Sequence, residues 1–262
     1  MYANSKPATP WGFERGSCSL RVRREVELLG GPSQQDGAGR SEAPSSHRVR
    51  AICLDLDGTL IDPYLGISRS IAFAIDRLGR SEIDVTDCRA FIGPPIQETF
   101  RALLGHDDAA VTSAVQYFRE RYAERGIFEA RPYPDIPAVL ADLSAKASLF
   151  VCTSKPRLYA DRIMRAFALD RYFSGIYGSE LDGTHTRKSE LLAWLLKREG
   201  LSEGSVAMVG DRSLDISAAQ ENGLPGFGVL WGYGSEQELS DAGAMRLFSE
   251  VHQLRSLPSI IA

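Results

Sequence analysis

Two aspartates, two positions apart, follow a short apolar run and are followed by a glycine and a threonine. The segment reads AICLDLDGTL over residues 51–60, with the acids at Asp55 and Asp57. Residues at i and i+2 of an extended chain point the same way, so both carboxylates can face one cavity. Crowded carboxylates disfavour each other's ionisation unless a cation lies between them. The pattern therefore indicates a Mg²⁺ site, because Mg²⁺ takes oxygen ligands, beside a carboxylate that can carry a proton.

The alternative interpretation of this segment is a surface turn, because Asp-Gly pairs form turns readily. However, Ala51 to Leu54 reads as the continuous apolar run of a buried parallel strand. Ligands of open α/β sheets bind where such strands end. Gly58 has no Cβ and permits a sharp exit from the strand. We favour a functional site, because a turn gives no reason for two carboxylates at the end of a buried strand.

A second polar cluster follows the apolar run of residues 148–152, where Thr153 and Ser154 stand before a predicted helix. A hydroxyl together with the backbone N–H groups that open a helix makes a phosphate site. Helix capping is the alternative role for Ser154. The position of the pair at a strand end supports phosphate binding.

Further charged residues stand at the starts of two later helices. Lys188 opens a helix that carries four leucines, and such a lysine is ordinarily a solvated charge. Asp211 follows the apolar strand of residues 206–210, and Asp215 comes four residues later, where a helix dipole favours acids. Both aspartates could be plain capping residues. Together with Asp55 and Asp57 they make metal binding the better interpretation.

The elements that position these residues alternate along the chain. Helical patterns separate five short apolar strands, at residues 51–54, 148–152, 175–178, 206–210 and 226–230. We expect residues 226–230 to form the last strand. This alternation predicts an α/β fold, a doubly wound parallel sheet with helices on both faces.

A long helical block interrupts the alternation between the first and second strands. From Pro63 to Arg131 the sequence reads as helical throughout, with apolar residues every three or four positions. One glycine and two prolines break it in the segment Phe91–Ile96. That segment is either an inter-helix turn or a loop that reaches over the active site. The block predicts a helical cap inserted after the first strand.

Composition limits the partners of the protein. The 262 residues hold 30 Lys and Arg against 34 Asp and Glu, a formal net charge of −4, which argues against a nucleic-acid partner. No apolar run approaches the roughly 18 residues of a membrane span. The four cysteines and four histidines show no metal-ligand spacing. We expect a reducing, cytoplasmic location without disulfides.

Four segments resemble the motifs of the haloacid dehalogenase (HAD) superfamily, in the order of that family. Residues 55–60, DLDGTL, resemble the first motif, and Thr153, Lys188 and Asp211 with Asp215 match the second, third and fourth. The resemblance covers residues 49 to about 250. Within the family, five segments resemble the phosphoglycolate-phosphatase and 5′-nucleotidase-like branch: Phe91–Ile96, Thr153–Pro156, Gly178–Thr184, Gly210–Ile216 and Gly228–Gly234. Leu214 departs from that branch, where a polar residue, often His, is expected, and this leaves the substrate open.

The resemblance implies a role for each matched residue. Asp55 attacks phosphorus, and Asp57 serves as general acid and base. Thr153 hydrogen-bonds the phosphoryl oxygens, and Lys188 neutralises the nucleophile and the phosphate. The expected Mg²⁺ ligands are Asp55, Asp57 through its backbone carbonyl, Asp211, and Asp215 as a ligand or a neighbour of one. The residues expected to contact substrate are Gly58, Thr59, Ser154, Gly93 and Pro94.

The resemblance further implies a core of residues 49–62 and 132–262, a helical cap of residues 63–131, and a Mg²⁺-dependent phosphomonoester hydrolase. Its expected substrate is a small metabolite such as phosphoglycolate or a nucleoside 5′-monophosphate. A phosphomutase of the same fold is the main alternative. A dehalogenase needs neither metal nor the acid at Asp57, and a non-enzymatic receiver-type module gives no reason for a cap. Residues 1–48 show little periodicity and predict a disordered N-terminal extension, with an upstream translation start or a targeting extension as the alternatives.

Overall fold

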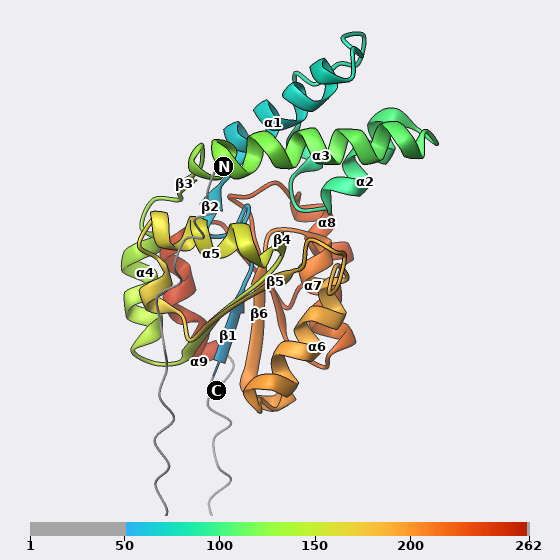
Figure 1. Ribbon diagram of the computed structural model, residues 1–262. Helices are drawn as coiled ribbons and strands as arrows, with labels where there is room; N and C mark the ends of the chain where they lie inside the picture. Colours follow the sequence, from blue (N-terminus) through green and yellow to red (C-terminus); the bar gives the residue numbers. More distant parts are fainter. Residues whose placement is uncertain (1–50, 261–262) are drawn as a thin grey trace, which may run out of the picture. The chain divides into compact units, whose positions relative to one another are not determined.

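The computed structural model describes residues 51–260 (Figure 1). The predicted N-terminal extension, residues 1–48, lies outside these described residues. A six-stranded sheet in the order β5-β4-β1-β6-β7-β8 forms the centre, and every neighbouring pair is parallel. The strands are β1 Ala51–Leu54, β4 Ser148–Pro156, β5 Gly175–Ser179, β6 Val206–Gly210, β7 Gly226–Val229 and β8 Arg246–Phe248.

The strand order contains a switch point next to β1. The chain proceeds from β1 to β4 and β5 on one side, then crosses to β6, β7 and β8 on the other. Leu54, the last residue of β1, is in register with Val151 of β4 and Val209 of β6, so β1 and β6 end within one residue of each other, while β4 continues further. Ligands of open parallel sheets bind at such a point, outside the carboxyl ends of the strands.

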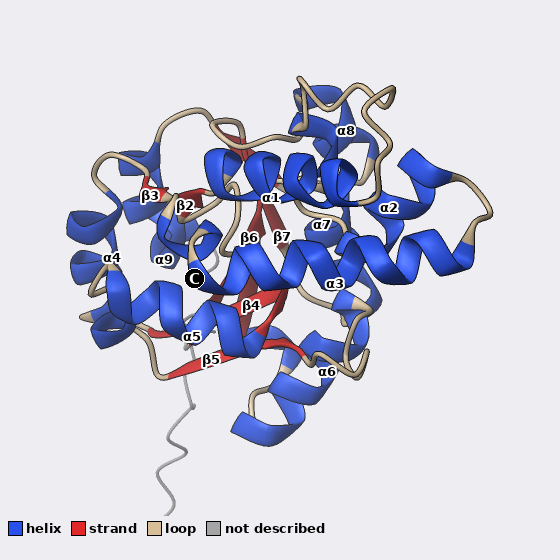
Figure 2. Ribbon diagram, turned by 45° about the horizontal axis from the view of Figure 1, so that its top comes forward, coloured by secondary structure: helices blue, strands red, loops and turns tan. Residues whose placement is uncertain are grey.

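Alternate residues of the strands face two separate apolar clusters. Ile52 and Leu54 belong to the larger cluster, whereas Ala51 and Cys53 face the smaller one. Helices cover both faces of the sheet (Figure 2), and the prediction of a doubly wound sheet is confirmed. These helices are α4 Ile136–Ser144, α5 Arg157–Ala166, α6 Lys188–Glu199, α7 Ser213–Glu221, α8 Glu236–Asp241 and α9 Leu257–Ile260.

Residues 63–131, called the helical insertion below, leave and re-enter the core through a two-stranded antiparallel stem. Its strands are β2 Ile61–Asp62 and β3 Arg131–Pro132. The helices are α1 Tyr64–Arg77, α2 Ile96–Leu104 and α3 Asp108–Glu124, and they lie together at one end of the sheet (Figure 1). The apolar stripes of the sequence coincide with these three helices.

The structure differs from the sequence expectation in three places. Residues 80–95 hold only a 3₁₀ turn, Arg89–Phe91, where the sequence reads as helical up to the break at Phe91–Ile96. The end of α1 at Arg77 is as expected, because Gly79, with a positive φ of 69°, is a helix stop that the sequence predicts. Strand β4 continues to Pro156, with an irregular register after Thr153. The segment 226–230 does not hold the last strand, since β8 pairs beyond β7 at the sheet edge. Three residues are too few for a periodic signal.

No helix among residues 51–260 is both long and apolar enough to cross a bilayer.

Candidate active site

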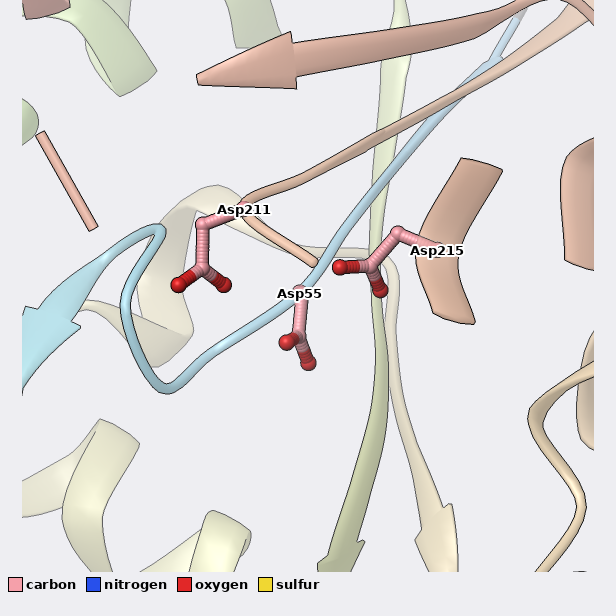
Figure 3. A group of neighbouring side chains, drawn as sticks. All are labelled: Asp55, Asp211 and Asp215. Carbon is pink, nitrogen blue, oxygen red and sulfur yellow. The ribbon is translucent and has the colours of Figure 1, made fainter. Parts of the chain in front are cut away.

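Three aspartates converge where β1 and β6 end and α7 begins (Figure 3). Asp55, Asp211 and Asp215 each offer a carboxylate oxygen, and these oxygens all lie within 4.8 Å of one another. All three side chains are buried. The switch point between β1 and β6 brings Asp55 and Asp211 together, although 156 positions of sequence separate them.

Glycines allow the aspartates to pack this closely. A Cβ on Gly210 would lie 2.0 Å from Cγ of Asp215, and a Cβ on Gly232 would lie 2.4 Å from Oδ2 of Asp211. No side chain fits at either position. Backbone donors then fix the carboxylates: the Tyr233 N–H donates to Asp211 Oδ2 at 2.8 Å, and the Arg212 N–H donates to Asp215 Oδ2 at 3.0 Å.

Lys188 provides the positive charge of this cluster. Its Nζ lies 2.9 Å from Asp55 Oδ1 and also donates to Asp215 Oδ1. Burial alone would lower the pKa of Lys188, but the Asp215 and Asp55 carboxylates raise it well above its ordinary value. Lys188 is therefore a permanent ammonium. Asp55 Oδ1 has this ion pair but no aligned hydrogen-bond donor among the described residues.

A second buried ion pair lies beside the first cluster. The Nζ of Lys155 lies 2.8 Å from Asp57 Oδ2, and it also donates to the hydroxyl of Tyr122 on α3. Burial raises the pKa of Asp57, and Lys155 opposes that rise. The other oxygen, Asp57 Oδ1, is buried and has no hydrogen-bond partner within residues 51–260.

The charges of the two clusters do not balance. Four buried carboxylates face two ammonium groups, Lys155 and Lys188, which leaves a formal charge of −2. Burial and the neighbouring Asp215 and Asp55 raise the pKa of Asp211 well above its ordinary value. Burial raises the pKa of Asp215 to about 6, against the effect of Lys188. A divalent cation would offset this excess, and Asp211 Oδ1, which lacks a donor in the described chain, is a suitable ligand atom.

A cavity of about 80 Å³ adjoins Asp57 and lies between the core and the helical insertion. Ser154 and Lys155 line it from the core, and Gly93, Pro94 and Tyr122 line it from the insertion. The segment Phe91–Ile96 was interpreted either as an inter-helix turn or as a loop that reaches the site. Its position at this cavity fits the loop. The structure thus brings Asp57, Ser154, Gly93 and Pro94 to one cavity.

Seven sequence-predicted residues do not line this cavity: the four of the first cluster, Asp55, Lys188, Asp211 and Asp215, and also Gly58, Thr59 and Thr153. Thr153 is buried, and its hydroxyl accepts a hydrogen bond from the Lys155 N–H at 3.3 Å. Thr59 is fully buried, and its hydroxyl has no partner in the described part of the chain. Gly58 packs against Asp211 instead. Leu214, the departure from the branch pattern, is 43% exposed and is not among the residues that line the cavity.

Sequence reasoning missed three residues of the site. Lys155 directly follows the Thr-Ser pair, and this position at the end of a predicted strand could have indicated a role in the site. Tyr122 belongs to an apolar helical stripe and is buried as expected, but its hydroxyl reaches Lys155. Arg212 stands between two predicted ligands, and its guanidinium donates to the Ile92 carbonyl and to Glu238 Oε1, the latter at 2.9 Å. Nothing in the local pattern signals that role.

Comparison with known proteins agrees with this geometry. The profile of the haloacid dehalogenase-like hydrolase family matches residues 52–229, more than half of the chain. The chain belongs to that family. A 5′-nucleotidase of Pseudomonas aeruginosa is 44% identical over 215 residues, which cover 78% of this chain and 97% of the relative. The crystal structure of a predicted phosphatase from Clostridium acetobutylicum superposes with a TM-score of 0.76 at 32% identity, covering 80% of this chain and 98% of the other.

One of the similar proteins is named as a kinase and not as a phosphatase. The tyrosine-protein kinase PtkA of Mycobacterium tuberculosis is 36% identical over 184 residues, which cover 70% of this chain and 62% of the kinase. Phosphatases nevertheless predominate among the relatives with long coverage, and this member of the haloacid dehalogenase-like hydrolase family is a phosphatase. The family resemblance inferred from the four motifs is confirmed.

Proposed function

We propose that this family member is a Mg²⁺-dependent phosphomonoester hydrolase that works through an aspartyl-phosphate at Asp55. Its substrate is a small phosphorylated metabolite, such as phosphoglycolate or a nucleoside 5′-monophosphate. The observation that carries the proposal is the buried cluster of Asp55, Asp211 and Asp215, with Lys188, beside the cavity that Asp57 lines.

The reaction proceeds in two displacements. A carboxylate oxygen of Asp55 attacks phosphorus, the bond from phosphorus to the substrate oxygen breaks, and Asp57 donates a proton to that departing oxygen. Asp57 then takes a proton from water as the water oxygen attacks phosphorus, which releases inorganic phosphate and the Asp55 carboxylate. Covalent catalysis divides one difficult displacement into two easier ones, and Asp57 acts as acid in the first and base in the second.

The residues present fit a divalent cation. Asp55 and Asp211, the backbone carbonyl of Asp57, and Asp215 as a ligand or neighbour would hold it. When bound, Mg²⁺ offsets the repulsion between an anionic phosphate and the carboxylates. Lys188 keeps Asp55 oriented and adds positive charge where phosphate arrives. Thr153 contributes its hydroxyl from within β4, where the register becomes irregular.

In this proposal residues 63–131 act as a cap over a core formed by residues 49–62 and 132–262. The support is the cavity itself, whose lining comes from both parts. Seating of the cap would exclude water during phosphoryl transfer and select the leaving group. Gly93 and Pro94 are the cap residues at the substrate, with Ser154 opposite; Gly58 and Thr59 shape the turn beneath it.

We also propose a cytoplasmic location and a small-molecule partner. The support is the three cysteines of the described chain, Cys53, Cys88 and Cys152, which are free and buried, as in a reducing compartment. A nucleic-acid polymer remains an unexpected ligand for a chain of net charge −4.

The deciding experiment compares the wild type with Asp55→Asn in a phosphate-release screen with Mg²⁺. The screen contains phosphoglycolate, nucleoside 5′-monophosphates, sugar phosphates and aryl phosphates. Wild type should release phosphate and incorporate ¹⁸O from labelled water into it, while Asp55→Asn should be inactive yet folded. Asp76→Asn, an exposed aspartate on α1, is the matched control and should retain full activity. Turnover by Asp55→Asn would overturn the proposal, and transfer of the phosphoryl group to a sugar in place of water would favour a phosphomutase.

A further inference from the structure

Lys155 has no place in the reaction described so far, yet it is among the most buried charges of the described chain. Its side chain is 5% exposed, and its ammonium contacts Asp57 Oδ2 at 2.8 Å. The same ammonium donates to the Tyr122 hydroxyl and lies 4.7 Å from the centre of the Tyr122 ring. Burying an ammonium is costly unless partners compensate for lost water. These contacts provide that compensation.

The partners of Lys155 come from two separate parts of the chain. Asp57 follows β1 of the core, while Tyr122 belongs to α3 of the helical insertion. The Tyr122 ring is stacked on Phe118 at 5.1 Å and meets Tyr159 edge-on at 5.5 Å, so its hydroxyl is held in one place. Burial raises the pKa of Tyr122 to about 12, which keeps this hydroxyl protonated. The contact thus joins the insertion to the proton-transfer carboxylate.

The two oxygens of Asp57 differ in consequence. Oδ2 is held by Lys155, whereas Oδ1 is buried and has no hydrogen-bond partner among residues 51–260. An unpaired buried carboxylate oxygen is costly, and this one belongs to a residue that lines the cavity. Oδ1 is therefore the oxygen whose hydrogen-bonding capacity is unused, and a leaving-group oxygen that reached it would supply the missing partner. Lys155 fixes which oxygen that is.

We infer that Lys155 is a positioning residue, seated by Tyr122 of the helical insertion, that aims Asp57 Oδ1 at the leaving-group oxygen. This inference rests on the proposed function, because it assigns a partner to the acid of that reaction. In the first displacement the proton passes from Oδ1 to the departing oxygen, and Oδ2 remains paired with Lys155. When the insertion moves away, Lys155 loses the Tyr122 contact and Asp57 loses its fixed orientation. Acid catalysis would then depend on a seated insertion.

A structural role for Lys155 would give a different signature from a positioning role. Proton donation matters most when the leaving alcohol is a strong base and little when it leaves readily as an anion. A misaligned Asp57 should therefore lower the rate of phosphoryl transfer from an alkyl phosphate strongly. It should lower the rate from p-nitrophenyl phosphate far less. A loss of packing alone would affect both substrates equally.

The test measures single-turnover alcohol release from an alkyl phosphate and from p-nitrophenyl phosphate in four full-chain variants. Tyr122→Phe removes only the hydroxyl and should lower the alkyl rate by roughly 3–10-fold and the aryl rate by less than about 2-fold. Lys155→Met should lower the alkyl rate by about 10²-fold or more, within the usual range of acid catalysis. Lys155→Arg should recover part of that loss. Tyr117→Phe, on the same helix but outside the cavity lining, should match wild type.

A double variant tests whether Tyr122 acts through Lys155. Contacting residues of one network are non-additive, so Tyr122→Phe should have no further effect on the alkyl rate once Lys155 is Met. Additive losses, or equal losses on both substrates, would overturn the inference. Should Lys155→Met fail to fold in a thermal melt, the milder Tyr122→Phe alone decides by the same substrate ratio. Wild-type turnover and the Asp55→Asn result establish or reject the proposed function separately from these outcomes.

Discussion

A Cβ atom on Gly58 would lie 2.1 Å from Oδ2 of Asp211, closer than two such atoms can approach. Gly58 has a φ of +81°, in the left-handed region that favours glycine. The turn after β1, at Gly58, therefore packs directly against the Asp211 carboxylate after β6. The absence of a side chain at Gly58 sets the position of Asp211, and with it the spacing of the proposed metal ligands.

Gly58→Ala should consequently reduce metal affinity more than it reduces stability. Asp211 must shift to admit the methyl group, so the apparent Kd for Mg²⁺ should rise at least about 10-fold, while overpacking and backbone strain cost about 1–3 kcal/mol of unfolding free energy. Gly200→Ala is the matched control, because Gly200 has a φ of +64° and open space around its Cβ position. Mg²⁺ titration of activity and thermal melts separate the two effects. Equal Mg²⁺ affinities in both variants would show that this packing does not set the position of Asp211.

Mg²⁺ should stabilise the protein, and the size of this effect should depend on pH. At a Mg²⁺ concentration of 100 Kd the gain is about 2.7 kcal/mol, or roughly 5–10 °C in Tm for a domain of this size. The pKa of Asp215 is raised to about 6 by burial, against about 3.9 in an unfolded chain. Between these values the folded state binds more protons, so metal-free stability should fall as pH rises through this window.

The Mg²⁺-induced rise in Tm should therefore be large above pH 6 and shrink as pH falls towards 4, since protons then compete for Asp215 and Asp211. Differential scanning fluorimetry with Mg²⁺ or EDTA across this pH range measures it. The Asp211→Asn variant provides the control and should show a reduced shift at every pH. A wild-type shift that is independent of pH would contradict the assignment of the ligands.

Asp57→Asn should slow both displacements while Asp55 can still attack. The amide cannot donate a carboxylic proton or accept one from water, so kcat should fall on the order of 10²–10⁴-fold. Rapid-quench measurement of the phosphorylated enzyme would follow each step separately. An unchanged kcat with a purified, sequence-verified variant would refute the role of Asp57.

Arg212→Ala should raise KM, because Arg212 connects the metal-ligand segment to the loop that lines the cavity. Its guanidinium donates to the Ile92 carbonyl and to Glu238, and loss of such charge-assisted bonds costs about 1–3 kcal/mol. We expect the loop to become mobile and the Mg²⁺ affinity to change little. Arg165→Ala, an exposed arginine on α5, is the control. A variant with wild-type KM would show that the loop holds its place without this link.

Leu214→His should leave activity and substrate preference nearly unchanged. Leu214 is 43% exposed and does not line the cavity, and surface substitutions of this kind usually change stability by less than about 0.5 kcal/mol. Steady-state rates on the substrate screen measure the outcome. A marked change in the preferred substrate would place this position in contact with the leaving group after all.

The sequence by itself determined the family, the parallel sheet and the group of residues at its edge. This was possible because the signals are local: an apolar run predicts a buried strand, and polar residues after several parallel strands must meet at one edge. Asp55, Lys188, Asp211 and Asp215 were therefore predictable without coordinates. The stripes of α1, α2 and α3 were predictable for the same reason, whereas the three-residue strand β8 was too short to give a signal.

Only the tertiary structure decided how the helical insertion meets the core. Tyr122 and Lys155 are 33 positions apart, and Arg212 and Ile92 are 120 apart. Neither pair leaves a trace in periodicity, since Tyr122 reads as one more apolar residue and Arg212 as a surface charge. Such contacts depend on how two separately folded segments pack, and packing is a property of the assembled surfaces. The role proposed for Asp55 was thus predictable from local sequence, whereas the contact of Lys155 with both Asp57 and Tyr122 arises from long-range packing.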